Sequence, residues 1–283
     1  MTDRFAVVGA GQMGSGIAHV CATSGFAVTL IDVSADALAK GRASIEKNLE
    51  RQVKKGALEA AARDAALALI TGATALDAVA RATVVVEAAT ERKELKFKIF
   101  RDIDRLADAG AILGTNTSSI SITEIAAVTK RAESVIGMHF MNPVPVMQLV
   151  EVIRGLATSD ATNARTVALA KALGKTPVEA SDFPGFIANR ILMPMINEAC
   201  FAVMEGVGTP EAVDQVMKLG MNHPMGPLAL ADLIGLDTCV AILEVLQSGL
   251  GDPKFRPCPL LKKYVAAGWL GRKSGRGFHI YAS

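Results

Sequence analysis

The sequence predicts an α/β protein, with a mainly parallel sheet domain followed by an all-helical C-terminal domain. Short apolar runs alternate with segments of helical periodicity in residues 1–182, which is typical of a parallel sheet covered by helices on both faces. After Asp182 the apolar runs stop and only helical patterns continue. We therefore expect one domain over residues 1–182 and a second over 183–283.

The elements follow from periodicity and from turn signals. The runs rich in Val, Ile, Leu and Ala predict strands at 5–9, 27–32, 68–71, 84–89, 111–115, 135–140, 149–153 and 177–180. Between the first two runs, Met13, Ile17 and Val20 share one face of a predicted helix. In the second domain, Gly and Pro signals separate predicted helices at 186–205, 209–219, 227–248 and 258–267.

The composition excludes several classes of function. The 283 residues are 51 % hydrophobic and 20 % charged, which suits a packed core rather than a disordered chain. A net charge of +2 offers no field for nucleic acid or for an anionic membrane surface. No run approaches the ~18 apolar residues that a spanning helix needs. We expect no nucleic-acid partner and no membrane partner.

The cysteines and the N-terminal segment point to a reducing compartment. Cys21, Cys200, Cys239 and Cys258 form no C-x-x-C pair and no Cys/His cluster with zinc spacing, so no metal site is predicted. We expect them to be small buried hydrophobic residues. The N-terminal segment lacks the plan of a signal peptide, which predicts a cytoplasmic protein.

The strongest motif is the glycine-rich segment GAGQMG at 9–14, between the first predicted strand and a helix. Gly9 permits a tight turn, and Gly11 lets the backbone approach a pyrophosphate at the helix N-terminus. Gly14 lets helix and strand pack closely, so this context indicates a Rossmann-type dinucleotide-binding domain. The predicted cofactor contacts here are Gly9, Gly11, Gln12, Met13 and Gly14.

Asp32 closes the second predicted strand, 18 residues after Gly14. Its carboxylate can accept hydrogen bonds from an adenosine ribose and repel a 2′-phosphate, which predicts NAD rather than NADP as cofactor. The alternative is that Asp32 caps the next helix and that the glycines serve only a turn.

Polar residues also lie along three later strands. The segment GTNTSS at 114–119 follows one strand, His139 lies near the end of the next, and Glu151 lies in the third. A histidine at a strand end is more often structural than catalytic. A histidine with a nearby glutamate in an NAD-binding chain, however, is typical of a general base supported by a carboxylate.

These motifs resemble those of the L-3-hydroxyacyl-CoA dehydrogenases, most closely the stand-alone bacterial 3-hydroxybutyryl-CoA dehydrogenases. The resemblance covers nearly the whole chain, through GAGQMGSGIA, VVVEAATE, TNTSSISIT, GMHFMNPVPVMQLVEVIRG, DFPGFIANRI, GMNHPMGPLALADLIGLD and GWLGRKSGRGFHIY. It implies an NAD-dependent oxidoreductase that interconverts (S)-3-hydroxyacyl-CoA and 3-oxoacyl-CoA, with 3-hydroxybutyryl-CoA and acetoacetyl-CoA as the expected pair.

The resemblance implies four catalytic residues. His139 would take the proton from the 3-hydroxyl group, and Glu151 would orient the imidazole ring and stabilise its charged form. Ser118 would hydrogen-bond the substrate oxygen, and the amide of Asn189 would hold that oxygen without titrating. On the sequence alone, Ser118 is more simply explained as an N-cap and Asn189 as an exposed helix residue.

The resemblance also implies cofactor contacts outside the glycine motif. Glu91 and Lys96 would flank the nicotinamide ribose, while Asn116 and Ser118 would approach the nicotinamide. Lys273 near the C-terminus is the last of these contacts. Each charged residue could equally be a solvated surface group.

A basic stripe is the predicted site for the coenzyme A phosphates. Lys47, Arg51, Lys54 and Lys55 recur at helical spacing and share one face, which can bind phosphate groups. The alternative is an ordinary solvated face, because two glutamates are interleaved. The predicted substrate contacts are Lys55, Arg51, Lys54, Ser118 and Asn189.

The second domain carries more apolar surface than one domain buries. Its first predicted helix is apolar nearly all round, through Phe186, Ile187, Ile191, Leu192, Met195 and Ile196. This excess favours an oligomer interface, and the resemblance implies a C2 homodimer through a helical, substrate-binding C-terminal domain.

Two alternative functions stay open. A related dehydrogenase could act on a free hydroxy acid or sugar acid without coenzyme A, and the basic stripe argues against it. A non-catalytic NAD-binding protein, such as a redox sensor, would not need Ser118, His139, Glu151 and Asn189 together.

Overall fold

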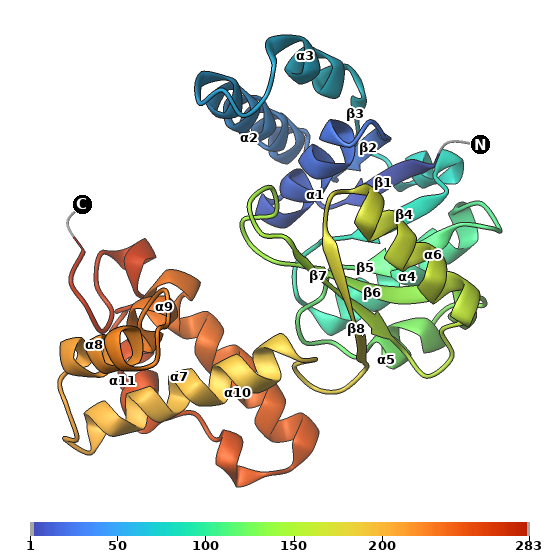
Figure 1. The fold of residues 1–283 in the computed structure, drawn as a ribbon. Helices are drawn as coiled ribbons and strands as arrows, with labels where there is room; N and C mark the ends of the chain where they lie inside the picture. Colours follow the sequence, from blue (N-terminus) through green and yellow to red (C-terminus); the bar gives the residue numbers. More distant parts are fainter. Residues whose placement is uncertain (1–2, 282–283) are drawn as a thin grey trace. The chain divides into compact units, whose positions relative to one another are not determined.

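The computed structural model describes residues 3–281, which form two compact units that adjoin in the sequence between Phe183 and Pro184 (Figure 1). The sheet lies wholly in the first unit, and the second unit is helical. This confirms the predicted fold class. None of the helices within residues 3–281 is both long and apolar enough to cross a membrane.

One eight-stranded sheet organises the first unit, in the spatial order β3-β2-β1-β4-β5-β6-β7-β8. Its strands are β1 (Arg4–Val8), β2 (Ala27–Ile31), β3 (Ile70–Ala73), β4 (Val84–Glu87), β5 (Ile112–Thr115), β6 (Val135–Phe140), β7 (Leu149–Arg154) and β8 (Thr176–Ser181). Strands β1 to β6 are parallel, whereas β7 runs antiparallel to β6. The strand order changes direction between β1 and β4, which is where such sheets bind ligands.

Helices cover both faces of this sheet. They are α1 (Gln12–Thr23), α2 (Ala35–Lys54), α3 (Ala60–Ala68), α4 (Lys93–Leu106), α5 (Ile122–Ala127) and α6 (Asp160–Ala172), with short 3₁₀ helices η1 (Leu76–Arg81) and η2 (Ala132–Ser134). Ile17 of α1 and Leu169 of α6 share one buried cluster with Val7 of β1. On the opposite face, Ile122 of α5 packs closely over Gly137 of β6. Two covered faces explain why the strands are apolar throughout.

The second unit has its own apolar core. It comprises α7 (Ala188–Met204), α8 (Pro210–Gly220), α9 (Pro227–Ile234), α10 (Leu236–Leu250) and α11 (Pro259–Ala266), with η3 (Pro253–Phe255) and η4 (Arg272–Ser274). Met193, Leu228 and Leu243 belong to its buried cluster. The fully buried carboxylate of Asp232 accepts hydrogen bonds from the backbone N–H groups of Phe278 (3.0 Å) and His279 (2.9 Å), which fasten the C-terminal segment.

Several sequence-based elements differ from the structure in their bounds, and one of them is divided in two. The strand predicted at 68–71 begins at Ile70, because Ala68 still belongs to α3. The helix predicted at 227–248 is two helices, because Gly235 has a φ of +105°, a conformation outside the helical region that glycine adopts without steric cost.

We expect Asp182→Ala to destabilise the first unit. The Asp182 carboxylate accepts hydrogen bonds from the backbone N–H groups of Ile122 (3.0 Å) and Thr123 (2.7 Å) at the start of α5. Losing these bonds should cost about 1–2 kcal/mol, seen as a lower midpoint of urea unfolding. Asp160→Ala is the control, because its side chain is 94 % exposed and it should change the midpoint little. Equal effects of the two substitutions would contradict this role of Asp182.

Candidate active site

The glycine loop after β1 has the shape that a pyrophosphate group needs. Gly9 has a φ of +106°, and a Cβ atom there would lie 2.6 Å from the carbonyl oxygen of Ala88. A Cβ on Gly14 would overlap the carbonyl oxygen of Gly9. At Gly11, by contrast, no protein atom lies within 4 Å of a Cβ position. The protein's own packing requires the first and third glycines, whereas the space at Gly11 faces the N-terminus of α1, where an anionic ligand fits.

The Asp32 carboxylate lies against this loop. Its Oδ2 accepts a hydrogen bond from the Ala10 N–H group (2.8 Å), and its Oδ1 accepts one from the Ser34 N–H group (3.0 Å). Helix α2 is capped by Ser34, whose side chain accepts a hydrogen bond from the N–H group of Ala37 (3.2 Å). Asp32 therefore is not the cap of α2, and its position beside the glycine loop fits recognition of a ribose.

The first turn of α1 contains the other two predicted residues of the motif. The Gln12 amide donates a hydrogen bond to the side chain of Asn142 (3.0 Å), which follows β6. Met13 is half-buried and packs against the core of the first unit. The glycine loop and the loop after β6 are thereby joined at one edge of the sheet.

His139 and Glu151 face each other across the only antiparallel strand pair of the described sheet. They are register partners in β6 and β7, and the distance between His139 Nδ1 and Glu151 Oε2 is 2.7 Å. Both are buried, with 6 % and 1 % exposure. Direct cross-strand partners are close enough for their side chains to interact, so the sheet itself fixes this pair.

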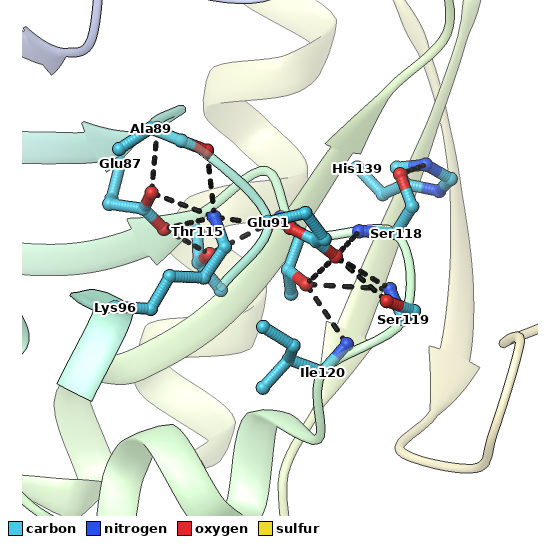
Figure 2. A network of polar contacts seen from close by, with 10 residues as sticks. Glu87, Ala89, Glu91, Lys96, Thr115, Ser118, Ser119, Ile120 and His139 are labelled. Atoms are coloured by element: carbon cyan, nitrogen blue, oxygen red, sulfur yellow. Dashed lines mark hydrogen bonds and ion pairs between the residues drawn. The ribbon is translucent and has the colours of Figure 1, made fainter. Parts of the chain in front are cut away.

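Ser118 completes a line of three polar side chains. Its Oγ lies 3.0 Å from Nε2 of His139, the ring nitrogen opposite the one that contacts Glu151 (Figure 2). Parallel β5 and β6 end at the same edge, which brings the turn after β5 next to His139. Helix α5 is capped by Ser121, whose hydroxyl accepts a hydrogen bond from the Glu124 N–H group (3.2 Å). Ser118 is thus not the N-cap that the sequence alone suggested.

Other predicted cofactor contacts lie around the same edge. The Asn116 side-chain oxygen accepts a hydrogen bond from the Phe140 N–H group (2.9 Å) and so ties the ends of β5 and β6 together. Glu91 accepts hydrogen bonds from the turn that carries Ser118. Lys96 is only 1 % exposed, and its Nζ lies 2.8 Å from Oε1 of the fully buried Glu87.

Sequence reasoning missed Glu87 as part of this network. A signal was present, because a carboxylate that ends the otherwise apolar run VVVE at 84–87 needs a partner inside the protein. Lys96, nine residues later, supplies that partner from α4.

Two predicted site residues belong to the second unit. Asn189 is the second residue of α7 and is 8 % exposed, so it is not the exposed helix residue of the alternative prediction. Lys273 in η4 is exposed, and its Nζ lies 2.6 Å and 2.7 Å from the two carboxylate oxygens of Asp237.

The basic stripe lies at the C-terminal end of α2. Lys47, Arg51, Lys54 and the C-cap residue Lys55 are all exposed, and within residues 3–281 none of these four side chains takes part in an ion pair. The nearby Glu46 pairs instead with Arg42, one turn earlier (3.2 Å). The stripe therefore presents a positive surface that its interleaved glutamates do not neutralise by direct contact.

All four cysteines are buried thiols, as predicted. Burial raises the pKa of Cys239 to about 12 and raises that of Cys200 well above its usual range. Thiols of this kind stay protonated at neutral pH and are poor nucleophiles, so Cys200 and Cys239 are not candidate nucleophiles.

Comparison with known proteins agrees with this geometry. Residues 4–183 match the family model described as 3-hydroxyacyl-CoA dehydrogenase, NAD binding domain, and residues 185–281 match the corresponding C-terminal domain. A probable 3-hydroxybutyryl-CoA dehydrogenase of Bacillus subtilis is 58 % identical, over 98 % of this chain and 97 % of that protein. The 3-hydroxybutyryl-CoA dehydrogenase of Bradyrhizobium diazoefficiens is 56 % identical over 98 % of this chain and 95 % of that protein.

The chain belongs to the 3-hydroxyacyl-CoA dehydrogenase family. The crystal structure of (S)-3-hydroxybutyryl-CoA dehydrogenase from Ralstonia eutropha matches it with a TM-score of 0.97 and 52 % identity, over 100 % of both chains. The predicted resemblance is thereby confirmed. The predicted cofactor is confirmed as well, since the first unit is the NAD-binding domain of this family.

We expect Asp32→Ser to narrow the preference of this dehydrogenase for NADH over NADPH. The substitution removes the negative charge that would repel a 2′-phosphate, and no arginine follows in Val33, Ser34 or Ala35 to attract one. Fluorescence titration gives the dissociation constants of NADH and NADPH. Their ratio should come closer to one in the variant than in the wild-type protein. A wild-type protein that already prefers NADPH would contradict the assignment of Asp32.

Proposed function

We propose that this chain interconverts (S)-3-hydroxyacyl-CoA and 3-oxoacyl-CoA, with 3-hydroxybutyryl-CoA and acetoacetyl-CoA as its substrate pair. The observation that carries the proposal is the line formed by Ser118 Oγ, His139 Nε2 and Glu151 Oε2, at the same edge of the sheet as the glycine loop. When bound, NAD supplies the hydride acceptor for the alcohol or, as NADH, the hydride donor for the ketone.

The three side chains divide the proton chemistry among them. Glu151 accepts the hydrogen bond from Nδ1–H, which leaves the lone pair of a neutral His139 on Nε2. Nε2 can then take the proton of the 3-hydroxyl group as the carbonyl forms, and it returns that proton in the reductive direction. Glu151 stabilises the imidazolium that results, and the Ser118 hydroxyl hydrogen-bonds the reacting oxygen.

Asn189 is the proposed fourth member of the site. An amide can hold the reacting oxygen without exchanging protons with it, and the buried position of Asn189 at the start of α7 supports more than a surface role. Asn189→Ala should lower kcat/KM for acetoacetyl-CoA by at least about tenfold, with NADH affinity kept. An unchanged kcat/KM would remove Asn189 from the site.

The exposed basic stripe supports coenzyme A, rather than a free acid, as the substrate carrier. Arg51, Lys54 and Lys55 offer charged donors to phosphate groups on a surface that nearby carboxylates do not neutralise. A free hydroxy acid would have no use for this stripe.

The direct test is the oxidation of NADH by the protein with acetoacetyl-CoA. We expect turnover by the wild-type protein, and a rate lower by about 10²–10⁴-fold in His139→Gln with NADH binding intact. Turnover with free acetoacetate at a similar kcat/KM would favour the dehydrogenase of a non-CoA acid. Binding of NADH without turnover of either compound would favour a non-catalytic NAD-binding protein.

The second unit supports a homodimer. Apolar side chains on its surface include Ile191 (67 % exposed), Val207 (77 %) and Leu219 (82 %), as expected for surface that a second copy covers. Sedimentation should give the mass of two chains, and Ile191→Glu should shift the equilibrium toward one if α7 lies in the interface.

We expect Glu151→Gln to move the pH dependence of the reaction as well as lower its rate. In the reductive direction His139 must start protonated, so kcat/KM falls as pH rises. The carboxylate of Glu151 favours the protonated ring, and the glutamine amide removes that charge. The reductive limb should therefore shift to lower pH in the variant. If the two pH–rate profiles differ only by a constant factor, the charge of Glu151 does not affect the protonation of His139.

A further inference from the structure

Glu91 is the acceptor around which the Ser118 turn is built (Figure 2). Its Oε1 accepts hydrogen bonds from the N–H groups of Ser118 (3.0 Å) and Ser119 (3.1 Å), from the Ser119 hydroxyl (2.9 Å) and from the Thr117 hydroxyl (2.5 Å). Every one of these donors belongs to the three residues 117–119. One carboxylate oxygen therefore fixes the backbone on both sides of the Ser118 side chain.

Lys96 fixes Glu91 in turn. Its Nζ lies 3.3 Å from Oε2 of Glu91, 2.8 Å and 3.0 Å from the two carboxylate oxygens of Glu87, and 3.2 Å from the carbonyl oxygen of Ala89. An ammonium group has three donors, and these four protein oxygens already share them. At 1 % exposure, Lys96 is held firmly among these protein oxygens.

The carboxylate of Glu87 anchors this network in the sheet. Glu87 is the last residue of β4, and it also accepts hydrogen bonds from the hydroxyl of Thr115 in β5 (2.7 Å) and from the N–H group of Ala89 (2.7 Å). The network thus runs without interruption from two central strands through Lys96 and Glu91 to the turn.

The charge of Glu91 strengthens these contacts. Partial burial by itself would raise the pKa of Glu91, but the charge of Lys96 and the hydrogen bonds from Thr117, Ser119 and Ser118 outweigh it, so that the pKa lies below its ordinary value. Glu91 is therefore ionised at neutral pH, and hydrogen bonds to an ionised acceptor are shorter and stronger than those to a neutral one.

We propose that Glu91 and Lys96 are positioning residues of the active site, which hold the 117–119 turn so that the Ser118 hydroxyl stays in contact with Nε2 of His139. Lys96 acts on Glu91, and Glu91 acts on Ser118. This role is additional to the contacts with the nicotinamide ribose that the family resemblance implies for these two residues. The inference rests on the proposed function, because it assigns their effect to the serine of that site.

A double-mutant cycle between Glu91→Gln and Ser118→Ala tests this directly. The glutamine keeps the size of the side chain but loses the charge. Its amide nitrogen is a donor, and it must face either the Lys96 ammonium group or the donors of the turn, so one set of contacts is lost. In the wild-type background we expect kcat to fall by between about tenfold and a hundredfold, the cost of a small displacement of a catalytic group. In the Ser118→Ala background the same change should cost less than about twofold.

Thr117→Val provides a second variant with no predicted cofactor contact. Thr117 is 1 % exposed, and valine keeps its shape while removing the hydroxyl that binds Glu91. We expect a lower kcat with the NADH dissociation constant unchanged, and recovery of activity in Thr117→Ser. Lys96→Met alone would leave Glu87 buried without a counter-charge, so Lys96 is tested in the neutral pair Glu87→Gln/Lys96→Met. The loss of kcat in this double variant should also be smaller in the Ser118→Ala background than in the wild-type background.

Lys93→Met is the matched control on the same helix. Lys93 of α4 forms an exposed ion pair with Glu124 (2.7 Å), outside the network, and its loss should leave kcat and NADH binding unchanged. Equal losses from Glu91→Gln in both backgrounds, or weaker NADH binding with kcat kept, would overturn the inference and leave cofactor contact as the only role of Glu91. A wild-type protein that does not turn over acetoacetyl-CoA would instead refute the proposed function, and this inference with it.

Discussion

The antiparallel pairing of β6 and β7 is the constraint on which the site depends. It makes His139 and Glu151 direct cross-strand partners, so the backbone ladder itself holds the imidazole against its carboxylate. Every other described pair of neighbouring strands in this sheet is parallel. Because β6 also pairs with β5 in parallel, the turn that carries Ser118 reaches the same histidine from the other side. One strand with two kinds of neighbour thus assembles three side chains.

The buried pair of Glu87 and Lys96 shows how the same sheet supports the turn. Burying two charges costs more than their attraction returns unless further hydrogen bonds satisfy them. Here the hydroxyl of Thr115 and the backbone of Ala89 supply those bonds. A pair so completely satisfied is weak evidence for stability. The pair instead fixes the position of the Lys96 ammonium group in the sheet, and that group contacts the Glu91 carboxylate.

The sequence was sufficient for the fold class and for the glycine loop, because apolar periodicity and glycine spacing are local signals. The candidate roles of Ser118 and Asn189 come from the family resemblance and stay predictions. His139 and Glu151 were identified as a pair, but their strand register was not, since register depends on which strand turns back. Local reasoning also placed the helix cap at Ser118, whereas a second serine three residues later caps α5. The resemblance implies that Lys96 flanks the nicotinamide ribose, and the alternative is a solvated surface group, but the Lys96 side chain is buried. Its burial depends on Glu87, a partner that only the packing of α4 on β4 brings into contact.

The charge of Glu91 does not change through the neutral pH range. The pKa of Glu91 lies below its ordinary value of 4.5. A carboxylate with a lowered pKa in the folded state contributes stability that is fully present above its unfolded pKa and is lost only as the pH falls through the folded pKa. The bracing of the turn by Glu91 is therefore constant through the neutral range. A pH dependence of activity near neutrality is therefore not expected to originate in Glu91, because its hydrogen bonds to the Ser118 turn persist in that range.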